Sequence, residues 1–147
     1  MASRESMVAS DPPGPGVARA ERALVVLIAV HSIAVGLFLV LAPEWGARFG
    51  GFGPVQPLFF ARQAGAFHFV AATAYLVEYF RYRGVLLLVV TKSVAVVFLL
   101  LTSAVDSVPW VVPLSGVADG LMGLAVVLVR RVEGRDLAGP CGWRSAP

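Results

Sequence analysis

The stretch RALVVLIAVHSIAVGLFLVLA, residues 22–42, decides the fold class of this chain. It is almost continuously apolar and stops immediately before Pro43. As a helix rising about 1.5 Å per residue, it is long enough to cross the roughly 30 Å hydrocarbon core of a bilayer. Three more apolar segments of similar length follow at 58–80, 84–105 and 110–130. A membrane β-barrel would instead need segments of about ten residues that alternate apolar and polar, so the sequence predicts helices.

The composition of the chain supports a place in a membrane. Of its 147 residues, 58% are hydrophobic and 14% are charged, whereas soluble domains have roughly 45–50% and about 25%. A soluble domain of this size could not bury that much apolar surface. We therefore predict an all-α fold, a four-span transmembrane helical bundle of up-down-up-down topology over residues 21–131. A disordered polar tail is expected at 1–20 and a second tail at 132–147.

The arginines predict the orientation of the four spans. Nine of them fall on the side that the two termini and the second loop would share, namely Arg4, Arg19, Arg22, Arg81, Arg83, Arg130, Arg131, Arg135 and Arg144. The opposite side carries only Arg48 and Arg62. Because cytoplasmic loops of membrane proteins carry the excess of basic residues, both termini are expected in the cytoplasm, at the bacterial inner membrane.

The loops between the segments predict how neighbouring helices are connected. The short loops at 81–83 and 106–109 predict antiparallel hairpins between the helices that they join. Aromatic side chains favour the membrane interface, so Trp45 and Trp110 are expected to anchor the outer surface. Arg62 lies about one turn inside the second segment and is expected to be an interface anchor that snorkels to the head groups. Glu78, near the other end of that segment, is expected to pair with Arg81 three residues later.

One ionisable residue lies near the middle of each segment: His31, His68, Lys92 and Asp119. A charged side chain at the bilayer centre costs at least about 2.5–3.5 kcal/mol, so such residues normally face the bundle interior and find partners there. Because the four lie at one depth, we take them as the candidate ligand-binding site.

Four interpretations of these residues remain open. In the first, Lys92 and Asp119 form only a buried ion pair that holds the last two helices together, and each histidine forms a hydrogen bond with a backbone carbonyl or a Ser or Thr side chain. A polar cavity could instead bind a small ligand such as a lipid head group, a quinone or a metabolite. The two histidines, His31 and His68, could hold a b-type haem for electron transfer. A proton- or ion-coupled transport path is the fourth interpretation, and it would require the bundle to oligomerise.

No set of residues in the sequence resembles a catalytic site. There is no nucleophile elbow, HExxH motif, phosphate-binding loop or dinucleotide fingerprint. The single cysteine, Cys141, excludes an intramolecular disulfide and a cysteine-based metal cluster. We therefore expect no enzyme activity, cofactor, metal or nucleic-acid partner. The expected function is that of a non-enzymatic accessory protein in the lipid bilayer that binds a small hydrophobic ligand or a partner membrane protein. The transport interpretation also requires the chain to form a homo-oligomer.

Two stretches resemble small four-helix bacterial membrane proteins of the DoxX-like type. These are AVGLFLVLAP at 34–43, an apolar run with a glycine that ends at a proline, and FARQAGAF at 60–67, a helix start with an arginine and a glycine. The resemblance extends over about residues 22–130. It implies a four-helix membrane fold, and it supplies no shared catalytic residues for this chain. The pairing of Lys92 with Asp119 has no counterpart in this resemblance.

Overall fold

A computed structural model describes residues 15–139 of the chain, and all regular secondary structure in that range is helical. The prediction of an all-α fold is therefore confirmed. The elements are α1 (Pro15–Leu41), the short α2 (Pro43–Phe49), α3 (Phe59–Val77) with its π-helical continuation η1 (Glu78–Tyr82), α4 (Leu86–Val105) and α5 (Val111–Val132).

Three of these helices, α1, α4 and α5, are long and apolar enough to cross a membrane. Large apolar side chains are exposed along all three, as expected for surfaces in contact with lipid. The chain is thus a multi-pass helical membrane protein. Helix α3 is not among the three because Arg62, Gln63 and His68 lower its mean hydropathy. A fourth span remains a prediction.

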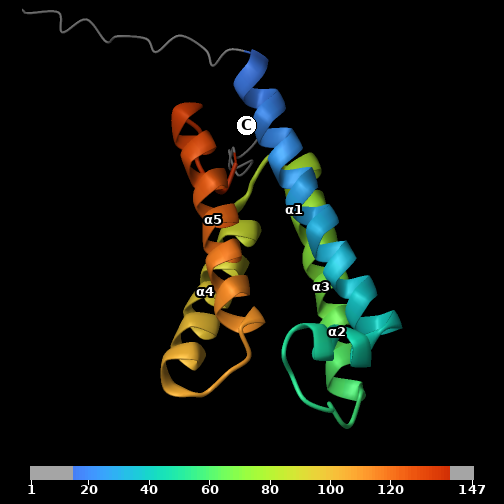
Figure 1. Cartoon of the computed structure of the whole chain (residues 1–147). Helices are drawn as coiled ribbons and strands as arrows, with labels where there is room; N and C mark the ends of the chain where they lie inside the picture. The colour runs from blue at the N-terminus through green and yellow to red at the C-terminus, as the bar shows by residue number, and fades with distance from the viewer. Residues whose placement is uncertain (1–14, 140–147) are drawn as a thin grey trace, which may run out of the picture.

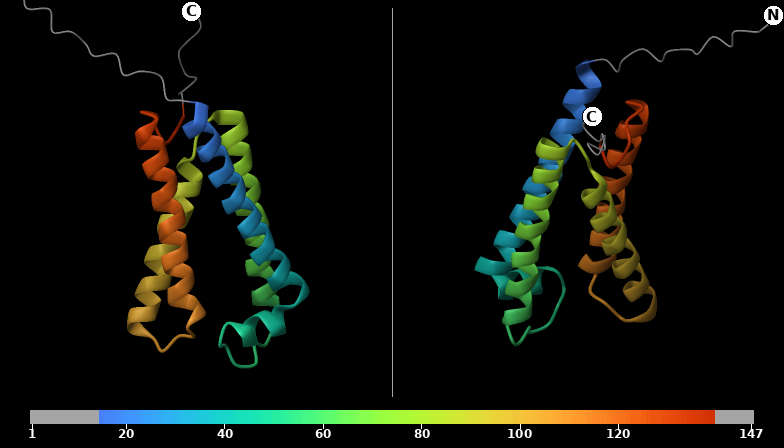
Figure 2. Two further views of the ribbon diagram at one scale, coloured as in Figure 1. Left: turned by 45° about the horizontal axis from the view of Figure 1, so that its top comes forward. Right: turned by 180° about the vertical axis from the view of Figure 1, so that it is seen from behind.

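The helices pack as two pairs that meet at one end. Helix α1 lies along α3, and α4 lies along α5 (Figure 1). Both views in Figure 2 show the pairs in contact near the start of α1 and the end of α5, and diverging toward α2 and the α4–α5 loop. The short loop at 81–83 was expected to join an antiparallel hairpin, and α3 and α4 do run in opposite directions. The two helices approach each other mainly near their connecting turn.

Small residues explain why α3 pairs with α1 rather than with α4. A Cβ added at Gly36 would lie 2.9 Å from the carbonyl oxygen of Gly65, and one added at Gly65 would lie 2.8 Å from the carbonyl oxygen of Gly36. The two backbones therefore touch at this crossing, as small residues allow in membrane helices. On α5, Gly116 faces side chains of α4 instead, because a Cβ there would lie 3.1 Å from Leu100 and 3.2 Å from Leu99.

The hydrophobic core lies at the end where the two helix pairs meet. Its members come from every long helix: Val25, Ile28, Tyr75, Tyr79, Val85, Leu88 and Val126.

The structure describes part of each predicted tail, and it differs from the prediction in the first one. Helix α1 begins at Pro15, so residues 15–20, expected in the disordered tail, are helical. Proline is well suited to the first turn of a helix, since its fixed φ and missing N–H cost nothing there. After α5 the chain folds back, and the Val85 N–H donates a hydrogen bond of 2.8 Å to the Leu137 carbonyl. The remaining parts of both tails, 1–14 and 140–147, lie outside the described residues.

At the opposite end, aromatic rings connect α1, α2 and α5. The ring centroids of Phe38 and Trp45 are 5.0 Å apart, those of Trp45 and Phe49 5.3 Å, and those of Phe49 and Trp110 5.9 Å. Such distances are typical of favourable aromatic pairs. The rings hold α2 against the ends of two long helices.

Candidate functional site

The centre of the candidate site is an ion pair between α4 and α5. The Lys92 ammonium donates a hydrogen bond to Oδ1 of Asp119, and the two side chains are 6% and 18% exposed. Gly123, one turn after Asp119, makes room for the lysine, because a Cβ there would lie 3.4 Å from that of Lys92. The lysine stem thus lies over the glycine face of α5, and its charge meets the carboxylate.

Helix α3 contributes two further polar side chains near this pair. His68 is half-buried and lies close enough to Lys92 and Asp119 to be affected by both charges. Tyr75, two turns later, is buried next to Thr91 of α4 and is also close to Asp119. We call these four residues, His68, Tyr75, Lys92 and Asp119, the polar centre.

His31, the fourth ionisable residue expected at this depth, has an exposed side chain. The buried stripe of α1 instead runs through Val25, Ile28, Ala29 and Ser32. Neighbouring residues of a helix point about 100° apart, so burying Ser32 turns His31 away from the packed face. The sequence expectation that His31 faces the interior therefore differs from the structure.

A groove of about 380 Å³ runs along the seam between α4 and α5, and both Lys92 and Asp119 line it. Its other walls are apolar or small side chains, and its rim includes the exposed Val97 and Leu124. Ligand pockets in proteins are typically about 300–1,000 Å³, mostly apolar, with a few polar groups that fix orientation. The groove has this character, and it opens onto an apolar surface of the protein.

A larger hollow of about 790 Å³ lies along α3 and η1, away from the ion pair. It is mainly apolar, and its one carboxylate, Glu78, is already used. The buried Glu78 accepts a 2.8 Å hydrogen bond at Oε2 from the Leu87 N–H in the first turn of α4. This carboxylate caps α4, whose first N–H groups have no partner within the helix. The expected pair of Glu78 with Arg81 does not form within residues 15–139.

A second charged cluster, which the sequence analysis missed, closes the end where the helix pairs meet. Glu21 of α1 is fully buried and lies 3.4 Å from Nε of Arg130 and 3.7 Å from Arg135. Arg135 also pairs with Glu133 at 3.0 Å. The spacing of Glu21 to Val25, Ile28 and Ser32 is the periodic signal that places it on the buried stripe of α1.

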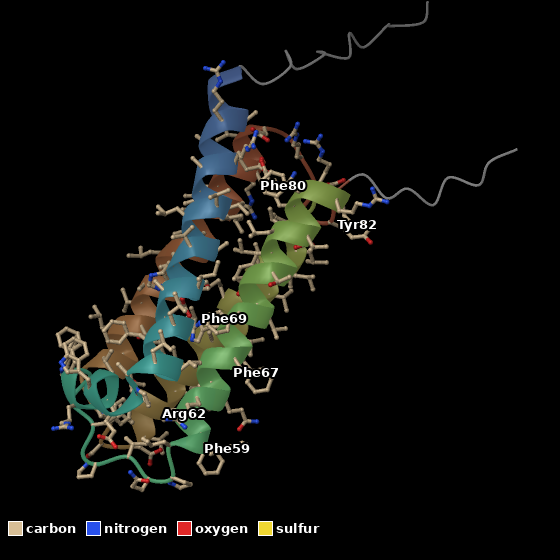
Figure 3. All side chains as sticks on the ribbon, turned by 90° about the vertical axis from the view of Figure 1, so that its right-hand side faces the viewer. Phe59, Arg62, Phe67, Phe69, Phe80 and Tyr82 are labelled. Atoms are coloured by element: carbon tan, nitrogen blue, oxygen red, sulfur yellow. The ribbon has the colours of Figure 1, made fainter. Side chains whose placement is uncertain are left out.

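The three expected interface anchors lie at the end of the molecule that carries α2. Trp45 and Trp110 are half exposed and belong to the aromatic row described above. Arg62 is exposed near the start of α3 (Figure 3). The same view shows Phe59 and Phe67 on the outer surface of α3, where both side chains are largely exposed.

Residues 15–139 contain no group of three side chains suited to hold a metal ion. Comparison with protein-family models, with curated proteins and with solved structures gave no match. The function must therefore be argued from the site itself.

Proposed function

We propose that this chain is a four-span, non-enzymatic protein of the bacterial inner membrane whose polar centre binds the head group of a small amphiphile. In this proposal α3 is the fourth span, because it packs along the apolar α1 and runs antiparallel to it (Figure 1). Seven of the nine arginines lie within residues 15–139, in the first turns of α1, in and after η1 and at or just after the end of α5, and we expect that end of the molecule to face the cytoplasm. The resemblance to DoxX-like proteins agrees with this architecture and remains a prediction.

The observation that carries the proposal is a buried ion pair in the wall of an open groove. A lysine ammonium has three N–H donors. Within residues 15–139, the only hydrogen bond of the Lys92 side chain is the one to Asp119. Two donors are left in an environment where unmet hydrogen-bonding capacity is costly. An oxygen acceptor that enters along the groove would use them.

These features define the chemical class of the ligand. Its head group would carry a carbonyl, carboxylate or similar oxygen acceptor for Lys92, and its body would be apolar to match the groove and the surrounding lipid. Quinones and fatty acyl compounds have this form. A pair that served only to hold α4 to α5 would need no groove beside it.

The experiment that tests the proposal compares what the protein retains on purification. The double variant Lys92→Met/Asp119→Leu removes both charges and leaves neither partner unpaired. The matched control is Glu44→Gln/Arg48→Gln, which removes the exposed ion pair of α2 at the far end of the molecule. Organic extracts of each purified protein are analysed by mass spectrometry.

We expect the wild type and the control to retain a compound of this class in proportion to protein, and the double variant to lose it while its helix content is unchanged. Identical extracts from all three proteins would contradict the proposal.

A further inference from the structure

A second pocket lies at the arginine-rich end of the molecule, outside the polar centre. It has a volume of about 400 Å³ and is lined by Arg83, Arg130, Arg135, Asp136 and Gly139. Its walls come from the turn before α4, the last turn of α5 and the segment that folds back after α5. Three arginines and one aspartate therefore line the same space.

The backbone around this pocket is held in a defined conformation. Arg83 adopts a left-handed φ of 57°, and its carbonyl accepts a 2.5 Å hydrogen bond from a terminal guanidinium nitrogen of Arg130. Gly139 also has a positive φ, and a side chain there would collide with the Tyr82 carbonyl. These contacts close the chain around the pocket, so the arginines are placed by the fold rather than gathered on a loose surface.

Arg130 shows that the charge in this pocket is built into the structure. It is 2% exposed, and its Nε–H faces Glu21 at 3.4 Å without completing a hydrogen bond. The buried Glu21 and Glu133 do not line the pocket, and they form ion pairs with Arg130 and Arg135. Arg83 is exposed and forms no ion pair with any residue from 15 to 139. One cation at the pocket is thus available to a ligand.

We propose that this pocket binds a phosphate group, presented by the head group of an anionic phospholipid. Planar guanidinium groups match phosphate oxygens and bind them in pairs. The pocket lies at the end of the candidate span α5, the level at which lipid phosphates occur, and basic pockets between membrane helices on the cytoplasmic side are typical sites for such head groups. Free phosphate has the same chemistry, and the test separates the two sources. The proposal rests on the membrane location of the chain and is independent of the polar centre.

Binding is measured on the full-length protein in an uncharged detergent. Dioleoyl phosphatidylglycerol is titrated and bound lipid is counted by native mass spectrometry, with dioleoyl phosphatidylcholine as the reference lipid. The test variant is Arg83→Gln, which keeps the backbone carbonyl that Arg130 uses. The matched control is Arg81→Gln, which removes the same charge from an exposed residue of the same turn that does not line the pocket.

We expect Arg83→Gln to weaken phosphatidylglycerol binding by about five-fold, the effect of one arginine near an anionic lipid surface, and Arg81→Gln to change it by less than about two-fold. The proposal would be overturned if Arg83→Gln and Arg81→Gln weakened phosphatidylglycerol binding equally. It would also be overturned if the wild type bound the two lipids equally and did not bind phosphate.

A second variant acts in the opposite direction and does not depend on a loss of binding. Asp136→Asn removes the one carboxylate that lines the pocket, from an exposed position. It is expected to tighten phosphatidylglycerol binding, and a weakening would contradict the assignment. Excess inorganic phosphate leaves the lipid bound if the lipid is the natural source. If free phosphate is the source, phosphate alone raises the melting temperature of the wild type but not of Arg83→Gln.

The variant Lys92→Met/Asp119→Leu should bind phosphatidylglycerol as the wild type does. The experiments can therefore refute ligand binding at the polar centre and phospholipid binding at this pocket independently of each other.

Discussion

The ion pair of Lys92 with Asp119 predicts a specific pattern of stability changes when its charges are removed singly and together. Removing one partner of a buried pair costs about 3–5 kcal/mol, because the other charge is left without compensation. The Lys92 side chain is 6% exposed and that of Asp119 is 18% exposed. Asp119→Leu, which abandons the more buried charge, should therefore cost about 5 kcal/mol, and Lys92→Met about 3 kcal/mol.

The double variant should recover most of this loss. With both charges gone, no uncompensated group remains, and the unfolding free energy of Lys92→Met/Asp119→Leu should lie within about 1 kcal/mol of the wild type. The coupling between the two positions is then several kcal/mol, far beyond the roughly 0.3–0.5 kcal/mol error of additivity for independent sites.

The assay is reversible unfolding in mixed detergent micelles, followed by helix content. The control is the exposed pair of Glu44 with Arg48, 3.6 Å apart, where the same double-mutant cycle should give a coupling below about 1 kcal/mol. Single variants at Lys92 and Asp119 that cost less than about 1 kcal/mol would refute the reasoning. So would a double variant as unstable as the sum of the two single ones.

Two further predictions concern helix contacts. Gly65→Ala should lower the unfolding free energy by about 1–3 kcal/mol, because the added Cβ would lie 2.8 Å from the Gly36 carbonyl oxygen. The control Gly120→Ala places its Cβ 3.5 Å from a side chain only, so it should leave the unfolding free energy unchanged or raise it by up to about 1 kcal/mol. Equal effects of the two substitutions would contradict the close crossing of α1 and α3. Glu78→Ala should lower the unfolding free energy by about 1 kcal/mol, and it should speed hydrogen exchange at the Leu87 amide because that N–H loses its acceptor. An unchanged exchange rate at Leu87 would show that the Glu78 carboxylate does not cap α4.

Local patterns in the sequence predicted much of the fold. The four apolar segments correspond to α1, α3, α4 and α5, because helix formation in an apolar segment depends mainly on its own residues. The contact of Lys92 with Asp119 was one of the interpretations offered by the sequence, since two opposite charges at one depth have few other partners. The use of the pair in ligand binding is a separate matter and remains a proposal.

Features that depend on long-range packing could not be predicted in the same way. Helix α1 is apolar around most of its circumference, so its sequence pattern gives only a weak signal for the packed face. The exposure of His31 follows from the packing of α1, which buries the adjacent Ser32. The cap of Glu78 on α4 depends on the π-helical turn that carries it. The cluster of Glu21 with Arg130 and Arg135 joins residues more than a hundred positions apart in sequence, and only the fold brings them together.

The proposed polar centre requires α3 to cross the bilayer, because only then do His68 and Tyr75 lie at the same depth as the ion pair of Lys92 with Asp119. The test uses single cysteines at Gly53 and Ser107, both exposed in loops, in a Cys141→Ser background, labelled in intact cells with a membrane-impermeant maleimide. Four spans place the two loops on the same side, so both cysteines should be labelled from outside without permeabilisation. If α3 does not cross, the loops lie on opposite sides, and labelling of only one of the two cysteines would contradict the account.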